Sequence, residues 1–300
     1  MNLIESSVVE ILQGQCDDLK KQMFKHIERC GRTCYKSEDK ITDDSCLKFI
    51  EFIKTRGHLS VFEHGTVYLY LGLDDENQNN PVHEEKYGHI IETYNDLCCH
   101  LVAKYNDNQY SRVNVETVDG KRHHYITTNY RVIVENGWED DLQYMVAPMK
   151  EHTPRYTFLF VCDRGVSHEG VRHRVLSFSQ ESTRFCNYMK EKFGMSVTFI
   201  QPDWIKPEDQ AEFEEDLKYV ESLYFKYLNK GYVPQQARYF LINGTKTEIC
   251  ITGFDDQWDM FFGLRYYGKA GTPHPDMLKV ATMAFNIYKE KPRNRSVIYK

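Results

Sequence analysis

Apolar residues recur at helical spacing near the start of the chain. Steps of three or four residues between them predict a helix over residues 17–34. A second helix is expected over residues 44–55, with Gly57 as its C-terminal stop. The side chains expected to face inward are Leu19, Met23, Ile27 and Cys30 in the first helix, and Leu47, Ile50 and Ile53 in the second.

Apolar and aromatic residues then alternate from Thr66 to Leu73, which predicts a strand. Residues from about 74 to 154 have the character of a separate excursion. We expect within it a helix near 90–104, a polar turn at 106–108 and a charged, hairpin-like stretch through 118–122.

Strands and helices resume after this excursion. Strands are predicted at 155–162, 197–200 and 245–253, and helices at 207–229, 234–241, 255–267 and 275–290. Because these elements do not form a regular β-α-β alternation, they favour an α+β fold over a doubly wound parallel sheet.

The composition excludes several classes of protein. With 300 residues, of which 41% are hydrophobic and 14% aromatic, the chain can bury a substantial core. Its 38 basic and 44 acidic residues give a net charge of −6, which disfavours general electrostatic binding to nucleic acid. No long apolar window and no signal-peptide order occur, so we expect a cytoplasmic protein without a membrane partner.

Cysteine and histidine patterns point to neither a disulfide scaffold nor a metal site. The nine cysteines are scattered without a C-x-x-C pair, and the twelve histidines form no H-E-x-x-H motif. We therefore expect no metal.

A phosphate-binding pattern lies in the stretch RHRVLSFSQESTRF. Arginine offers a planar fork that matches phosphate oxygens, and serine hydroxyls supply further donors. The alternative is a solvated basic turn paired with Asp163, Glu169 and Glu181. The polar residues of interest are Arg172, His173, Arg174, Ser177, Ser179, Ser182 and Arg184.

A second candidate segment, Gly57–His64, lies between a helix end and a strand start. Its two histidines, serine and glutamate could handle protons, since histidine titrates near physiological pH. The alternative is a helix cap with a structural histidine.

Two further arginines have apolar neighbours. Arg238 lies in PQQARYFL and Arg265 in FFGLRYYG, so each is expected to be drawn toward a buried face. A buried charge must be paired, either with an internal carboxylate or with an anionic ligand.

Together these segments resemble the flavin-dependent thymidylate synthases, a family distinct from the synthases that use a cysteine nucleophile. The family signature Arg-His-Arg, seven residues and Ser is similar to Arg172–Ser182, and Gly-His-x-[Ser/Thr]-x-Phe-Glu-His is similar to Gly57–His64. Arg238 and Arg265 lie 265 − 238 = 27 positions apart, as expected of the family's two late arginines. Glu169 stands where the family often has Gln. The resemblance covers roughly residues 20–70 and 155–290.

The resemblance implies a reductive methylation of dUMP to dTMP. Methylenetetrahydrofolate would supply the carbon, and FAD reduced by NADPH would supply the hydride. It also implies one elaborated α+β domain over residues 1–300, with a mixed or antiparallel sheet, flanking helices and an insertion at about 74–154. A homotetramer with shared active sites is expected.

The resemblance also implies roles for individual residues. Arg265 and His58 would be catalytic, with Arg265 stabilising negative charge on the uracil ring. The residues implied for FAD are Ser60, Arg172, His173, Arg174 and Gln180. Those implied for dUMP are Glu169, Gln180, Glu181, Ser182, Arg184, Arg238 and Arg265.

Two rival functions stay open. In a cysteine-dependent methyltransferase, one thiol would need a depressed pKa, and Cys34 and Cys186 are the cysteines beside charged motifs. In a nucleotide- or flavin-binding homologue, the arginines would be kept without the catalysis. Flavin absorbance and its bleaching by NADPH would separate the enzyme from the binder.

Overall fold

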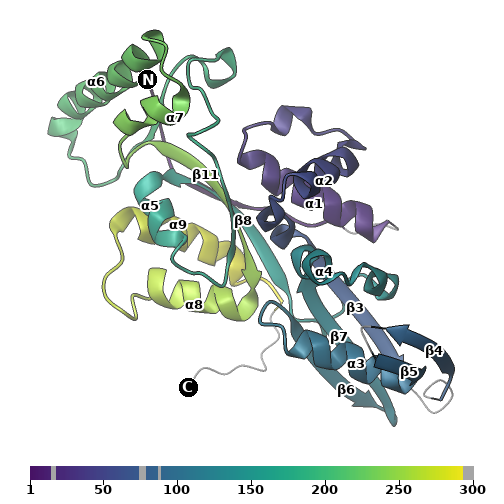
Figure 1. The fold of residues 1–300 in the computed structure, drawn as a ribbon. Coiled ribbons are helices and arrows are strands. Elements are labelled where there is room, and N and C mark those ends of the chain that lie inside the picture. The colour runs from purple at the N-terminus through teal and green to yellow at the C-terminus, as the bar shows by residue number, and fades with distance from the viewer. Residues whose placement is uncertain (15–17, 74–78, 87–88, 293–300) are drawn as a thin grey trace. The chain divides into compact units, whose positions relative to one another are not determined.

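The computed structural model describes residues 1–14, 18–73, 79–86 and 89–292 (Figure 1). The chain divides into two compact units. The first unit consists of Met1–Leu12, Glu28–Ser45 and Tyr156–Lys291, and the second of Gln13–Ile27, Cys46–Arg155 and the C-terminal residues from Pro292. Helix α1 (Leu19–Thr33) thus contributes residues to both.

The first unit is built on a four-stranded sheet of order β2-β8-β11-β9. Strand β2 runs antiparallel to β8, and β9 runs antiparallel to β11. A separate parallel pair joins β1 to β10. The strands are β1 (Asn2–Ile4), β2 (Ser7–Glu10), β8 (Arg155–Asp163), β9 (Ser177–Gln180), β10 (Thr198–Ile200) and β11 (Lys246–Phe254).

Alternation along β8 and β11 sends side chains to two different cores. Phe158 and Phe160 of β8 pack with Trp258 in one core, and Leu159 lies with Cys30 and Cys250 in another. A strand that is buried on both faces has a nearly continuous run of apolar residues, and β8 and β11 have such sequences.

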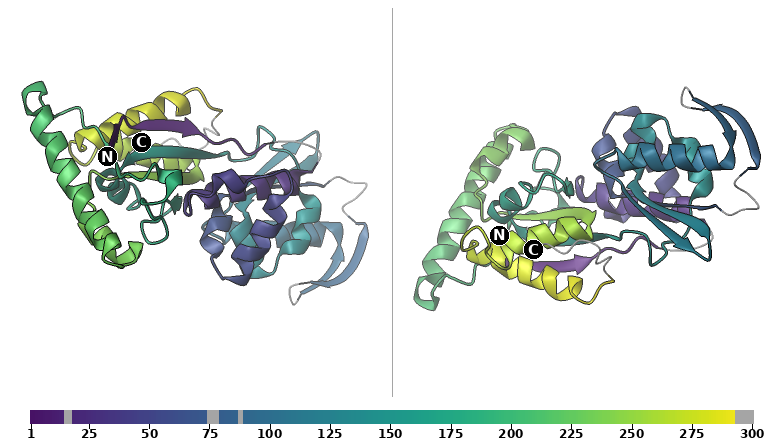
Figure 2. Two further views of the ribbon diagram at one scale, coloured as in Figure 1. Left: turned by 90° about the horizontal axis from the view of Figure 1, so that it is seen from above. Right: turned by 90° about the horizontal axis from the view of Figure 1, so that it is seen from below.

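The helices of the first unit are α5 (Arg164–Gly170), α6 (Gln210–Asn229), α7 (Pro234–Ala237), α8 (Asp255–Arg265) and α9 (Pro275–Tyr288). Helices α8 and α9 supply Trp258, Phe262 and Val280 to the main core. The long helix α6 borders the first unit in both views of Figure 2 and packs Leu217 and Tyr224 against Phe199. Short 3-10 turns lie at Glu38–Lys40, Glu191–Phe193, Pro207–Asp209 and Arg238–Phe240.

The second unit has a three-stranded antiparallel sheet of order β3-β7-β6 and a separate β4-β5 pair. Its strands are β3 (Thr66–Leu73), β4 (Pro81–Lys86), β5 (His89–Thr93), β6 (Arg112–Val118) and β7 (Lys121–Asn129). Its helices are α2 (Ser45–Thr55), α3 (Tyr94–Asn106) and α4 (Tyr130–Asn136), with 3-10 turns at Leu59–His64 and Glu139–Tyr144. Leu97 and Leu101 of α3 share a core with Val67 and Leu69 of β3.

The α+β class expected from the sequence is confirmed, since both units combine helices with mainly antiparallel strands. The excursion expected at 74–154 falls within the second unit. The description of residues 1–300 as one domain with an insertion stays a prediction. Among the described residues, no helix has both the length and the apolar character needed to cross a bilayer.

Most predicted elements are present, with corrected ends. The helix near 90–104 begins at Tyr94, because residues 89–93 pair with β4 as a strand. The helix expected over 234–241 is a single α turn followed by a 3-10 turn. Leu47 does not face inward: it is 51% exposed, and the buried face of α2 is formed by Cys46, Phe49, Ile50 and Ile53.

Candidate functional site

Helix α5 and the turns after it place the first site residues. β8 ends at Asp163, whose Oδ1 accepts a hydrogen bond from the Val166 backbone N–H at 2.8 Å and so caps α5. The helix presents Glu169 one turn later and ends at Gly170. The backbone N–H of His173 then donates to the Gly170 carbonyl at 3.1 Å, which turns the chain into the Arg172–Arg174 segment.

Arg265, the last residue of α8, binds two of these residues through all three guanidinium nitrogens. Its Nη1 donates to Glu169 Oε2 at 2.8 Å, its Nη2 to the Glu169 carbonyl at 3.3 Å and its Nε to His173 Nε2 at 3.1 Å. The Arg265 and Glu169 side chains are 20% and 28% exposed, so the ion pair is only partly screened by water. Of the two partners considered for Arg265, the internal carboxylate is the one present.

His173 is buried against the Phe261 ring, with ring centroids 4.9 Å apart. Burial first, and then the Arg265 charge, lower the pKa of His173 from 6.5 to about 4. The imidazole is therefore neutral at physiological pH, and its Nε2 acts as the acceptor for Arg265. His173 thus holds the guanidinium in place without adding charge.

Four arginines of the predicted site are exposed: Arg172, Arg174, Arg184 and Arg238. Among the described residues, Arg172 and Arg174 form no ion pair, whereas Arg184 Nε donates to Gln235 Oε1 at 3.2 Å and its guanidinium lies over the Phe185 ring. The expectation that Arg238 is drawn to a buried face is wrong, because the last turn of this short helical segment faces solvent.

Gln180 and Glu181 lie inside the sheet region instead of at the surface. Gln180 Nε2 donates to Ser167 Oγ at 2.8 Å and to Thr247 Oγ1 at 3.1 Å. Glu181 is 2% exposed and accepts hydrogen bonds from the Tyr188 hydroxyl and from Lys246, each at 2.9 Å.

The alternative, a basic turn whose arginines pair with Asp163, Glu169 and Glu181, is wrong about these ion pairs. Asp163 caps α5, Glu181 binds Lys246, and only Glu169 pairs with an arginine, which is Arg265 from outside the turn.

Ser182 lies at a tight turn beside the end of α1. Its backbone N–H donates to the Cys34 carbonyl at 3.0 Å, and its Oγ accepts from the Arg184 N–H at 3.3 Å. Burial raises the pKa of the Cys34 thiol to about 11 and that of Cys186 to about 12. Both thiols are therefore protonated near pH 7, and neither has the environment of a nucleophile.

His58 and Ser60 belong to the second unit. Both are exposed, at the start of the 3-10 turn Leu59–His64. In the same segment Glu63 binds Arg131, and His64 is fully buried, where desolvation lowers its pKa. The structural-histidine alternative therefore describes His64, while His58 keeps the exposure that proton handling requires.

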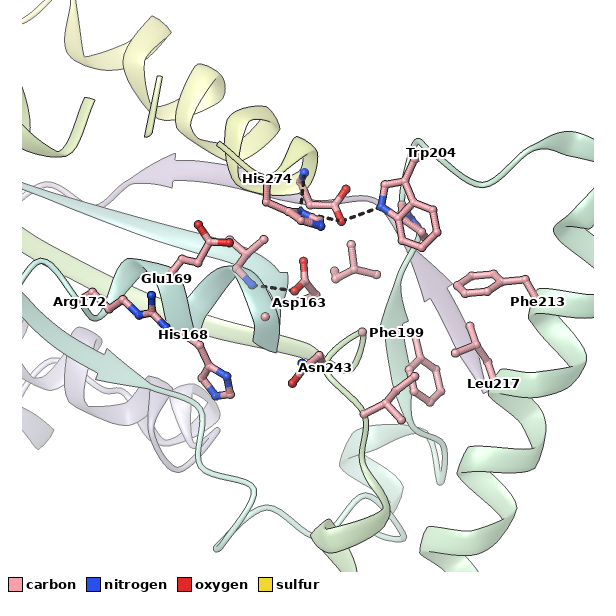
Figure 3. Close-up of a pocket in the computed structure, with 17 residues that line it drawn as sticks. Asp163, His168, Glu169, Arg172, Phe199, Trp204, Phe213, Leu217, Asn243 and His274 are labelled. Atoms are coloured by element: carbon pink, nitrogen blue, oxygen red, sulfur yellow. Dashed lines mark hydrogen bonds and ion pairs between the residues drawn. The ribbon is translucent and has the colours of Figure 1, made fainter. Parts of the chain in front are cut away.

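A cavity of about 480 Å³ lies beside the arginines in the first unit (Figure 3). Arg172, His168 and Glu169 line one end of it. Sequence reasoning missed the rest of the lining, which comes from segments far apart in the chain. The missed residues include Phe199, Trp204, Phe213, Leu217, Asn243 and Asp276, while Asp163 was considered only as a partner of the basic turn.

The first unit is thus an α+β body with four exposed arginines and with Arg265, which is fixed by a carboxylate and a neutral imidazole. Residues 145–291 match the family model Thy1, described as thymidylate synthase complementing protein. The match includes the arginine cluster, Arg238 and Arg265. It does not reach Gly57–His64, so the upstream part of the resemblance stays a prediction.

The chain is also similar to curated flavin-dependent thymidylate synthases. The chain is 32% identical to the flavin-dependent thymidylate synthase of Pyrococcus furiosus over 48% of this chain and 61% of that protein. It is 36% identical to that of Thermococcus kodakarensis over 35% of this chain and 42% of that protein. The chain spans about half the length of the curated relatives it matches. A solved UMP/dUMP methylase, PolB from Streptomyces cacaoi, aligns over 97% of this chain and 93% of that chain at 14% identity, with a TM-score of 0.41.

Proposed function

We propose that this protein is an enzyme that methylates dUMP reductively to dTMP, with methylenetetrahydrofolate as the carbon donor. The observation that carries the proposal is the location of the arginine cluster and of Arg265 inside residues 145–291, the part that matches the Thy1 family model. Exposed guanidinium groups suit the phosphates of nucleotides, which arginine binds through two parallel hydrogen bonds.

Arg265 is proposed as the catalytic residue. Held by Glu169 and His173, its guanidinium is preorganised, so little reorganisation is needed when charge develops on a bound uracil. Arg184 and Arg238 would bind the nucleotide phosphate and sugar, and the Ser182 hydroxyl would add a donor. His58 is proposed to act in proton transfer, which its exposure allows.

The residues assigned to FAD fit that group in part. Arg172 and Arg174 are exposed, and with no ion pair to carboxylates among the described residues they are available to a diphosphate. Ser60 is also exposed. His173 and Gln180 are engaged inside the protein, so we propose that they support the site from behind. When bound, reduced FAD would supply the hydride that protein side chains cannot carry, with NADPH as its reductant.

The test is dUMP-dependent oxidation of NADPH by the purified protein reconstituted with FAD. We expect flavin absorbance, bleaching by NADPH, and dTMP formation only when methylenetetrahydrofolate is present. Protein that binds dUMP and FAD without forming dTMP would instead be the catalytically altered homologue. Protein that binds neither would refute the proposal.

We also propose that the active site is completed between subunits of a homotetramer. The exposed arginines and the 86% exposed Tyr239 beside Arg238 support a surface that a second copy covers. Mixing inactive His58→Ala and Arg265→Ala subunits should restore part of the activity, because in a shared site these residues would come from different subunits and some mixed sites would carry both native residues. No recovery, or a monomer in light scattering, would refute the shared site.

A further inference from the structure

The cavity in the first unit extends well beyond the arginines. The wall opposite α5 is apolar and aromatic, with Phe199 from β10, Phe213 and Leu217 from α6, and Trp204 from the preceding turn (Figure 3). A volume of about 480 Å³ lies within the range of small-molecule pockets.

Two carboxylates line this cavity, and both are nine-tenths buried. Asp163 and Asp276 are each 9% exposed. Asp163 Oδ1 caps α5, but its buried Oδ2 has no hydrogen-bond partner in the part of the chain that the structure describes. Asp276 Oδ2 accepts from Trp204 Nε1 at 3.1 Å. A buried oxygen without a donor is costly, so a ligand that donates to it would stabilise the protein.

The positively charged groups of the lining do not balance the negative charge of Asp163 and Asp276. Glu169 is neutralised by Arg265, and Arg172 and His168 are exposed on the α5 side. At the start of α9, half-exposed His274 has its Nδ1 3.7 Å from Asp276 Oδ2. Burial raises the pKa of Asp163, and the Asp276 charge adds to that rise. A positive group beside both carboxylates would oppose both effects.

We propose that this cavity is a second ligand site that binds a small organic cation through a planar N–H donor group such as an amidinium. The donor group would contact Asp163 and Asp276, and the aromatic or aliphatic body would lie against Phe199, Phe213 and Trp204. A metal ion is a poorer match, because no group of three or more His, Cys, Asp or Glu side chains suited to a metal occurs among the described residues.

Benzamidine is the probe and neutral benzamide its isostere. Calorimetric titration of the full-length protein near pH 7.5 should give at least tenfold tighter binding of benzamidine than of benzamide, which corresponds to about 1.4 kcal/mol. Affinity for benzamidine should fall as the pH is lowered, because protonation of Asp163 removes the attracting charge. Excess dUMP should leave the affinity unchanged, since neither Asp163 nor Asp276 is among the residues proposed for dUMP, and Glu169 lies at the other end of the cavity.

The matched variant is Asp163→Asn, whose side-chain oxygen can still cap α5 while the charge is lost. It should weaken benzamidine at least tenfold, leave the affinity for benzamide unchanged and not lower the melting temperature, since it removes a buried charge. If this variant does not fold, Asp276→Asn, which keeps an acceptor for Trp204, should weaken benzamidine in the same way. Equal affinities for the two probes, an unchanged affinity in the Asn variant that folds, competition by dUMP or no saturable benzamidine binding would overturn the proposal, whatever the outcome of the dUMP assay.

Discussion

Arg265 illustrates how a side chain can be fixed before any ligand arrives. All three guanidinium nitrogens are bound by Glu169 and His173, in a geometry that an ammonium group cannot reproduce. We expect Arg265→Lys to lower dUMP-dependent NADPH oxidation by about 100-fold or more, as when a preorganised donor to developing charge is lost.

The thiol variants Cys34→Ala and Cys186→Ala serve as controls for Arg265. Because both thiols are protonated near neutral pH, each variant should keep substantial activity. The opposite ranking, with the cysteine variants inactive and the arginine variant active, would support the rival covalent mechanism.

His173 should make stability depend on pH. Its pKa is about 4 in the folded protein and near 6.5 when unfolded, so the unfolded state binds more protons between these values. The free energy of unfolding should therefore fall as the pH drops from about 6.5 to 4, by up to about 3 kcal/mol from this residue.

Urea unfolding at pH 7 and pH 4.5 measures the effect of His173. His173→Gln provides the comparison, because its amide oxygen can still accept from Arg265 but does not titrate. The loss of stability between the two pH values should be smaller in this variant. An equal loss would assign the pH dependence to other groups, such as buried His64.

For single residues, the sequence identified candidate site residues but not the residues that they contact in the fold. The arginines were found because their spacing is local, within 172–184. The partners of Arg265 and Glu181 lie 96 and 65 positions away, and no local pattern encodes such distances. Asp163 could have been suspected, since it directly follows an apolar strand.

Among the elements, β11 depends on close packing at one glycine. A Cβ on Gly253 would lie 2.1 Å from Leu176 Cδ2. Gly253→Ala should therefore destabilise the protein by about 1–3 kcal/mol through overpacking. Gly170→Ala is the control, because its Cβ would meet only Ile251 Cδ1 at 3.9 Å. Thermal unfolding compares the two, and equal melting temperatures would contradict this account.

The N-terminal strand β2 offers a second matched pair. Val8 packs partly buried against the main core, while Val9 on the opposite face is 51% exposed. Val8→Lys should lower the free energy of unfolding by about 1–2 kcal/mol, and Val9→Lys by less than about 0.5 kcal/mol. Chemical denaturation gives both values. If both variants are neutral, β2 contributes nothing to the stability of the first unit.

Helices and strands were predicted correctly where the apolar pattern repeats over many residues, and they were missed where the element is short. Helices α1 and α6 are amphipathic over 15 and 20 residues, and their positions were predicted. Neither α5 nor β9 was predicted, because seven and four residues give too little periodicity. In α2 the buried face was misjudged at Leu47, since several apolar residues compete for it.

On the scale of the whole molecule, the sequence supported the α+β class but not the pairing of distant strands. The first unit gathers three separate chain segments, and nothing local in β1 or β2 identifies β10 or β8 as a partner. Division of the chain into two units was likewise hidden, because α1 and β8 run through the boundaries without a change in composition.

The pairing of Ser7 with Val161 and of Val8 with Phe160 has a consequence for biosynthesis. While a ribosome elongates the nascent chain at about 5–20 residues per second, β2 must wait on the order of ten seconds before β8 emerges. Until then its apolar residues are accessible to chaperones and to other nascent chains. The second unit, whose residues from 46 to 155 are contiguous, can begin to fold during that interval.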